Sequence, residues 1–241
     1  MRELRRRIAN RELGEIRLIR GHYLQDWLTR DTDYNWRVDP AVSGQSRAVA
    51  DIGTHLFDIA EFLTGLRVDQ VFADLATLIP FRERPVTSSM AFAPTVGPRD
   101  RVRVESEDVA VVLLRFVGGA RGALVVSQVQ PGHKNDLTIE VAGSTKAGMW
   151  RHEDPENLWL SSLGHDRDTL PHPHDLAVPG IRELVPGHPE GLGSALRDLF
   201  RPFYAAVSSG APPPDPATAP YPTLWDGVHP AESSAQRGVF P

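Results

Sequence analysis

The sequence contains no cysteine among its 241 residues, and this absence removes several kinds of chemistry together. Disulfide bonds, thiolate zinc sites, iron–sulfur clusters and cysteine nucleophiles all need a sulfhydryl group. A chain without cysteine suits a reducing cytoplasm, where we expect this protein. The longest apolar run, near 109–114, is far shorter than the ~20 residues of a membrane-spanning helix. The arginines of the first seven residues are followed by no apolar segment, so we expect no signal peptide.

Basic residues are outnumbered, with 26 Lys and Arg against 31 Asp and Glu, for a net charge of −5. Nucleic acid and anionic membranes are bound by basic surfaces, so neither is an expected partner. The hydrophobic fraction of 41% and the charged fraction of 24% are ordinary for a globular protein. We therefore expect one folded domain over 1–241.

The sequence also lacks the glycine-rich turn of a dinucleotide-binding fold, which joins a strand to a helix as Gly-x-Gly-x-x-Gly. The nearest glycine cluster is Gly118-Gly119, and it lies between two strand patterns, so it predicts a hairpin. No Walker loop, nucleophile elbow or HExxH motif is present. No strong metal motif is present either, so we expect no metal.

Hydrophobic periodicity predicts an α+β fold. Alternation predicts strands over 15–25, 68–78, 108–116, 120–130 and 136–142, with shorter candidates at 148–152 and 157–160. Helical spacing predicts helices over 1–13, 48–63 and 189–208, with Gly14 and Gly65 ending the first two, and a last one near 231–236. Strands joined by hairpins favour an antiparallel sheet with the helices on one face. We expect a loop over 80–104, whose role stays open, and a Pro-rich segment over 210–241 that packs back on the domain.

The most distinctive local feature is Asp51, His55 and Asp58, which share one side of a predicted helix at i, i+4 and i+7. A carboxylate one turn from a histidine can fix its tautomer and make the imidazole a proton donor or acceptor near neutral pH. The opposite side, with Ile52, Ile59 and Phe62, would be buried. A purely structural alternative stays open, in which Asp51 is a helix N-cap and His55 a satisfied, half-buried histidine.

Two further segments contain candidate binding residues. Asn35-Trp36-Arg37 offers a flat apolar wall and a guanidinium, a pair that suits a polyol or sugar when acids and histidine stand nearby. His188 precedes the last long helix and could sit over a pocket. Each segment also has an ordinary explanation, as loop packing for Trp36 and Arg37 and as a loop histidine for His188.

Several segments in order resemble the C-terminal half of the Gfo/Idh/MocA oxidoreductases, the superfamily of glucose–fructose oxidoreductase and inositol dehydrogenase. They are Gly14-Glu15-Ile16, Tyr23, Gln25-Asp26-Trp27, Asn35-Trp36-Arg37, Ser43-Gly44, the run from Asp51 to Asp58, Gly187 to Gly191, and Pro222 to Gly227. The resemblance implies a large, open, mostly antiparallel sheet with helices on one face. The other face of that sheet usually makes the oligomer contact.

The resemblance also implies site residues. Asp51 and His55 match the family's Asp-x-x-x-His pair, in which the histidine acts as acid and base on a substrate hydroxyl while hydride leaves the carbon for NAD or NADP. Trp36, Arg37, Asp58 and His188 would line the substrate side. The sequence departs from the family because the N-terminal Rossmann half and its Glu-Lys-Pro lysine are missing, and Ala48-Val49-Ala50 replaces a Gly-rich run.

Three hypotheses follow. In the first, the chain is the substrate-binding and oligomerisation part of an NAD(P)-dependent sugar or polyol oxidoreductase, whose hydride chemistry needs a Rossmann partner. The second is a stand-alone lyase or isomerase that uses Asp51 and His55 without nicotinamide. The third is a non-catalytic binding or scaffold protein, which predicts that the surroundings of His55 are closed.

Overall fold

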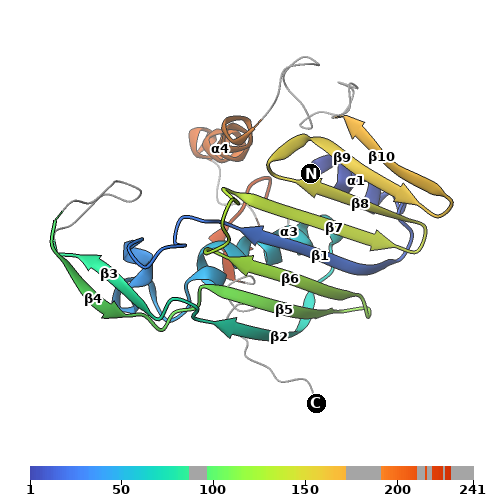
Figure 1. Ribbon diagram of the computed structural model, residues 1–241. Coiled ribbons are helices and arrows are strands. Elements are labelled where there is room, and N and C mark those ends of the chain that lie inside the picture. Colours follow the sequence, from blue (N-terminus) through green and yellow to red (C-terminus); the bar gives the residue numbers. More distant parts are fainter. Residues whose placement is uncertain (87–96, 172–190, 211–214, 216–218, 225, 229–241) are drawn as a thin grey trace.

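An open eight-stranded sheet dominates the computed structural model (Figure 1). The structure describes residues 1–86, 97–171, 191–210, 215, 219–224 and 226–228. Across the sheet the strands lie in the order β10-β9-β8-β7-β1-β6-β5-β2, and β3 and β4 form a separate two-stranded ribbon. Most of the segment 210–241 and the expected helix near 231–236 lie outside the described residues.

The elements have the following bounds. The strands of the large sheet are β1 (Ile16–Leu24), β2 (Val68–Ala76), β5 (Val109–Phe116), β6 (Arg121–Ser127), β7 (Asp136–Gly143), β8 (Lys146–Arg151), β9 (Asp154–Ser162) and β10 (His165–Pro171), and the ribbon strands are β3 (Phe81–Pro85) and β4 (Arg99–Arg103). The helices are α1 (Arg2–Ala9), α2 (Pro40–Ser43), α3 (Thr54–Thr64) and α4 (Leu192–Ser209), with a 3₁₀ turn at Trp36–Val38 and a π-helical turn at Val49–Gly53. The predicted α+β class with a large, mostly antiparallel sheet is confirmed.

One pair of neighbouring strands in the large sheet is parallel. β1 runs parallel to β6 and antiparallel to β7, whereas the other neighbours pair antiparallel. Leu24, the last residue of β1, lies opposite Ser127, the last residue of β6. The carboxyl ends of both strands therefore meet at one edge of the sheet, and the residues that follow them emerge side by side.

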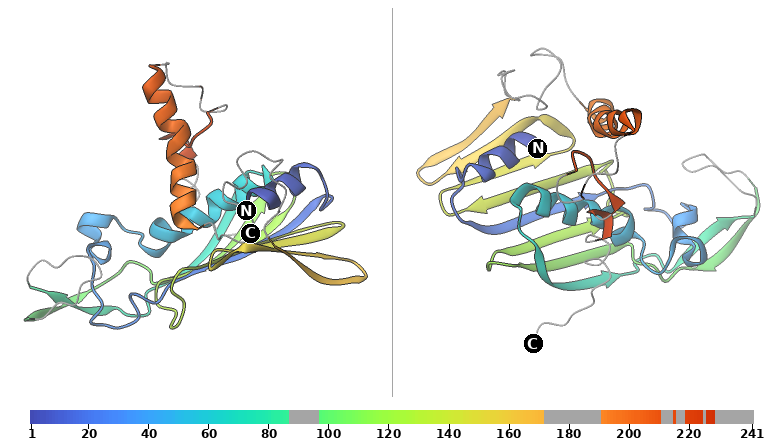
Figure 2. Two further views of the ribbon diagram at one scale, coloured as in Figure 1. Left: turned by 90° about the horizontal axis from the view of Figure 1, so that it is seen from above. Right: turned by 180° about the vertical axis from the view of Figure 1, so that it is seen from behind.

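The helices α1 and α3 cover one face of the sheet (Figure 2, right). The core lies between them and that face, where Leu4 of α1 and Leu56 of α3 are fully buried with Ile19 of β1 and Ile139 of β7. Every second residue of β5 and β6 points into this core, which is why the alternation in the sequence predicts these strands correctly.

Among the described residues, no helix lies on the face opposite α1 and α3, which is the face turned toward the viewer in Figure 1. Helix α4 stands away from the sheet on the helical side (Figure 2, left), and none of its residues is buried. Among the described residues, no helix is long and apolar enough to cross a membrane.

A buried ion cluster joins four segments at the base of the ribbon. Asp108, which precedes β5 and is fully buried, pairs with two buried guanidinium groups, those of Arg47 and Arg82. Its second oxygen, Oδ2, accepts the backbone N–H groups of Leu78 (2.7 Å) and Ile79 (2.8 Å). Arg82 belongs to β3, and its Nη1 donates to the backbone carbonyls of Leu28, Arg30 and Asp33 at 2.9–3.0 Å.

Glu107 adds a second buried carboxylate next to this cluster. Its Oε1 accepts the Ser46 hydroxyl (2.8 Å) and the backbone N–H groups of Arg47 and Val49 (both 2.9 Å). The two carboxylates, of Asp108 and Glu107, balance the formal charge of the two guanidinium groups. Glu107 also accepts hydrogen bonds from backbone N–H groups at the start of the π-helical turn.

The first helix is shorter than predicted. It ends at Ala9 instead of extending to Leu13, and Arg11 has a φ of 60°. Gly14 is not its C-cap. It has a φ of 75°, and a Cβ there would lie 2.2 Å from the Ser144 hydroxyl, so glycine is required where the chain turns into β1.

Two other predictions differ from the structure, and one strand, β10, was not predicted. Phe62 is only partly covered, with 36% of its surface exposed, because its ring faces α1 and the Arg5 guanidinium lies 4.0 Å above it. The predicted loop at 80–104 contains the ribbon strands β3 and β4, whose pairing is fixed by burial of Arg82. The segment from His165 is strand β10, which continues the sheet by pairing with β9.

We predict that Asp108→Ala destabilises the protein by about 3–5 kcal/mol, because it leaves two buried guanidinium groups without their shared carboxylate. Urea unfolding measures the change. The matched control is Glu105→Ala, whose side chain is 73% exposed and pairs with an exposed arginine, and which should change stability by at most about 0.5 kcal/mol. Equal effects of the two substitutions would contradict the prediction.

Candidate active site

The predicted pair of Asp51 and His55 spans the junction between the π-helical turn and α3. The Thr54 N–H donates to the carbonyl of Val49, five residues back, and this bond makes the turn π-helical. Such turns occur frequently at functional sites. Asp51 is half-buried and His55 is exposed, so a ligand can reach the imidazole. This exposure does not fit the closed surroundings that the scaffold hypothesis predicts.

The carboxylate of Asp51 is held from two sides. Its Oδ1 accepts Nε of Arg37 at 2.9 Å, and its Oδ2 accepts Nε2 of Gln128 at 2.8 Å. Arg37 comes from the loop segment before α2, whereas Gln128 directly follows β6. The structure thus brings together two of the predicted residues, Asp51 and Arg37, and adds an amide that the sequence did not indicate.

Trp36 and Arg37 form an exposed wall beside this carboxylate. The side chain of Asn35 caps their 3₁₀ turn by accepting the Arg37 N–H at 3.1 Å. The Arg37 guanidinium lies 4.5 Å from the centre of the Trp36 ring, and Trp36 is 50% exposed. An exposed aromatic face next to a charged hydrogen-bonding group is a surface on which the apolar side of a sugar or polyol can rest.

Tyr23, near the end of β1, lies beside His55. The two ring centres are 6.1 Å apart, and the Tyr23 hydroxyl donates to Oδ1 of Asn135 at 2.6 Å. Burial raises the pKa of Tyr23, and the nearby carboxylate of Asp51 raises it further. Tyr23 therefore stays protonated and donates a hydrogen bond at neutral pH.

The polar network continues past the end of β1. Asn135 Oδ1 also accepts Nε2 of Gln25 at 3.2 Å, and Gln25 Oε1 accepts the indole N–H of Trp27 at 2.7 Å. These side chains gather at the sheet edge where the parallel strands β1 and β6 both end. Tyr23 and Gln25 are polar residues at the end of a predicted strand, a signal that could have marked them, but no local pattern pointed to Asn135 or Gln128.

The two remaining predicted site residues are Asp58 and His188. Asp58, one turn beyond His55, lines a cavity of about 640 Å³ between α1 and α3, together with Arg5, Arg67 and Asp226. Desolvation raises the pKa of Asp58, and His55 offsets this only in part. His188 lies outside the described residues.

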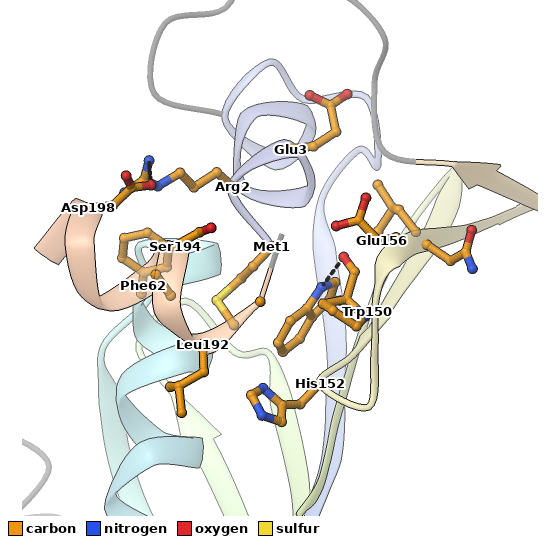
Figure 3. A pocket seen from close by; sticks show the side chains of 15 residues that line it. Met1, Arg2, Glu3, Phe62, Trp150, His152, Glu156, Leu192, Ser194 and Asp198 are labelled. Carbon is orange, nitrogen blue, oxygen red and sulfur yellow. Dashed lines mark hydrogen bonds and ion pairs between the residues drawn. The ribbon is translucent and has the colours of Figure 1, made fainter. Parts of the chain in front are cut away.

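A second cavity, of about 420 Å³, lies between α1, the β8–β9 hairpin and the start of α4 (Figure 3). Its walls include Trp150, His152, Phe62 and Leu192, and the Trp150 indole donates to the carbonyl of Pro155 at 3.3 Å. Asp51 and His55 do not line it. The predicted acid–base pair therefore lies apart from this cavity.

Among the described residues, neither a three-residue metal cluster nor a phosphate-binding glycine turn is present. These residues contain no group of three or more His, Asp or Glu side chains that could hold a metal ion. Gly118 and Gly119 form the hairpin between β5 and β6, as predicted, and not a phosphate-binding turn before a helix.

Comparison with known proteins identifies the family. Residues 1–147 match the GFO/IDH/MocA C-terminal domain, and the chain belongs to this family. The levoglucosan dehydrogenase of Pseudarthrobacter phenanthrenivorans is 32% identical over 189 residues, which cover 75% of this chain and 45% of that enzyme. The chain thus spans about half the length of the curated relatives that it matches.

Solved structures agree with this assignment. An oxidoreductase domain protein from Kribbella flavida superimposes with a TM-score of 0.81 at 27% identity, covering 97% of this chain and 59% of the other. An inositol dehydrogenase homologue from Azotobacter vinelandii, solved with NADH and myo-inositol, gives a TM-score of 0.76 at 25% identity, covering 98% and 57%.

We predict that His55→Ala leaves the fold intact and changes stability by at most about 0.5 kcal/mol, because the imidazole is exposed. The adjacent Leu56→Ala is the matched control. Leu56 is fully buried, so its truncation should cost about 2–5 kcal/mol. Thermal and urea unfolding compare the two, and a His55→Ala protein as unstable as Leu56→Ala would show that His55 is structural.

Proposed function

We propose that this chain is the substrate-binding and oligomerisation part of a cytoplasmic, NAD(P)-dependent sugar or polyol oxidoreductase. One observation carries the proposal: the Asp51 carboxylate is fixed by Arg37 and Gln128 beside an exposed histidine and an exposed tryptophan. Relatives whose names specify levoglucosan and myo-inositol support the substrate class.

In this proposal His55 accepts the proton of a substrate hydroxyl, and Asp51 orients the histidine and the substrate. Trp36 and Arg37 bind the apolar and polar sides of the ligand. Asp58 and His188 are kept on the proposed substrate side because of the family resemblance, although Asp58 lines the cavity between α1 and α3. An exposed imidazole can exchange its proton with water after each turnover.

Nicotinamide would supply the hydride acceptor, but the described residues do not fit such a cofactor. They form a mostly antiparallel sheet, and their one glycine pair lies in a hairpin. We therefore assign cofactor binding to a Rossmann domain. The proposed role of this chain is to bind the substrate and to accept its proton. The inositol dehydrogenase homologue was solved with NADH, and this supports an NAD-type cofactor for the whole enzyme.

We predict that the purified chain binds myo-inositol or levoglucosan with a dissociation constant on the order of millimolar and shows no saturable binding of NADH or NADPH. Asp51→Asn and His55→Ala should each weaken polyol binding about tenfold, whereas Asp74→Asn on the exposed edge strand β2 should not. Calorimetry measures both ligand classes. Polyol binding that neither site substitution alters would contradict the proposal, and tight NADH binding would refute the division between two domains.

The oligomerisation part of the proposal rests on the uncovered sheet face. Val111 of β5 and Val125 of β6 lie directly opposite each other on this face, 45% and 38% exposed. Leu113 (44%), two residues from Val111 on the same face of β5, extends this apolar surface. Contiguous apolar surface of this kind marks interaction sites, and a second copy of the same face can bury it symmetrically.

We predict that the chain is a dimer or larger at micromolar concentration in sedimentation velocity and that Val111→Glu converts it to a monomer by placing a charge in the interface. Val117→Glu is the control, because Val117 is 59% exposed at the hairpin tip and does not lie on the apolar surface. A monomeric wild-type chain, or equal effects of both substitutions, would contradict the prediction.

A further inference from the structure

Gln128 occupies an unusual position for an amide side chain. It directly follows β6, it is fully buried, and its Nε2 donates to Oδ2 of Asp51 at 2.8 Å. Its side-chain oxygen Oε1 is also buried and has no hydrogen-bond partner among the described residues. Most buried polar side-chain atoms are paired, so an unpaired one calls for an explanation.

Stability does not provide that explanation. A leucine of similar size would fill the same space without leaving an unpaired carbonyl. The amide is instead suited to the carboxylate it contacts, because it donates a hydrogen bond without adding charge. A lysine or arginine there would neutralise Asp51, and a glutamate would repel it.

The backbone of Gln128 is held as firmly as its side chain. Its N–H donates to the carbonyl of Asp108 at 3.1 Å, and its own carbonyl accepts the N–H of Leu28 at 3.2 Å. Asp108 is the centre of the buried ion cluster, and the loop after Leu28 is bound to Arg82 of the same cluster. The backbone of Gln128 is therefore hydrogen-bonded directly to the segments that form the buried ion cluster.

We propose that Gln128 is the positioning residue of the site: it fixes the orientation of the Asp51 carboxylate. With one oxygen on Gln128 and the other on Arg37, the carboxylate cannot turn to form a bidentate pair with the guanidinium. Asp51 and Arg37 thus keep hydrogen-bonding capacity for a polyol. This inference rests on the proposed function, because it assigns Gln128 a role in the same polyol site.

Two substitutions of Gln128 test the proposal. Gln128→Leu should fold, weaken binding of myo-inositol about tenfold and shift the Arg37 Nε–H signal in the NMR spectrum of ¹⁵N-arginine-labelled protein, a signal assigned with Arg37→Lys. Gln130→Leu is the matched control, because Gln130 is exposed two residues further on and should change neither measurement.

Gln128→Glu gives a pH profile that a merely structural role would not produce. Two carboxylates in contact share one proton at low pH, so the substituted side chain, while protonated, can still donate to Asp51. As pH rises the proton is lost and the two groups repel. The Arg37 signal should therefore be close to wild type near pH 5 and shifted by pH 8, and polyol affinity should fall between these two pH values by more than it changes in wild type.

The outcomes separate this inference from the proposed function. If wild type binds no polyol, the proposed function is wrong for this chain, and the Arg37 signal alone decides the role of Gln128. An Arg37 signal unchanged in Gln128→Leu, or polyol affinity equal to wild type, would overturn the inference. If Gln128→Leu does not fold, the isosteric Gln128→Glu tests the inference instead. A pH profile of polyol affinity and of the Arg37 signal equal to that of wild type would then overturn the inference.

Discussion

The pairing of one buried carboxylate, Asp108, with two buried arginines is the interaction on which the rest of this structure depends. A charge removed from water is tolerated only with complete partners, so the segments that provide these partners must assemble together. They are the loop after β1, the start of the helical segment that contains Asp51, the ribbon strand β3 and the beginning of β5. The cluster thereby fixes the π-helical turn relative to the sheet, and with it the candidate site.

The second constraint is topological. A single parallel pair in an otherwise antiparallel sheet brings the ends of β1 and β6 to one edge, and side chains distant in sequence converge there. Gln25 and Asn135 are 110 residues apart and share a hydrogen bond, and Gln128 reaches Asp51 across 77 residues. The site is thus built mainly from the ends of regular elements, which hold functional groups more accurately than free loops do.

The sequence predicted the parts of the fold that depend on local pattern. Alternation in β5 and β6, the glycine hairpin between them and the glycine after α3 all correspond to the structure, and the family resemblance identified the open sheet. Strand β10 was missed because its histidine, two aspartates and proline give no alternation of apolar and polar residues, and it is held at the sheet edge by pairing with β9 alone. The ribbon was missed because its pairing depends on Arg82, whose burial is a tertiary effect. Of the site, spacing indicated Asp51 and His55, but Gln128 shows its role only once β6 is placed beside the helix.

Helix α4 is the longest helix of the described residues, yet it buries little of its own surface. Its 18 residues include no buried one, and Pro202 in its interior removes a backbone hydrogen bond. A helix of this length is marginal in water on propensity alone, because most helical stability comes from burying an apolar face. Local opening of α4 therefore costs far less free energy than opening of the sheet. The chain thus combines a sheet with a buried core and a helix that lacks one, and amide hydrogen exchange should distinguish them by their different degrees of protection.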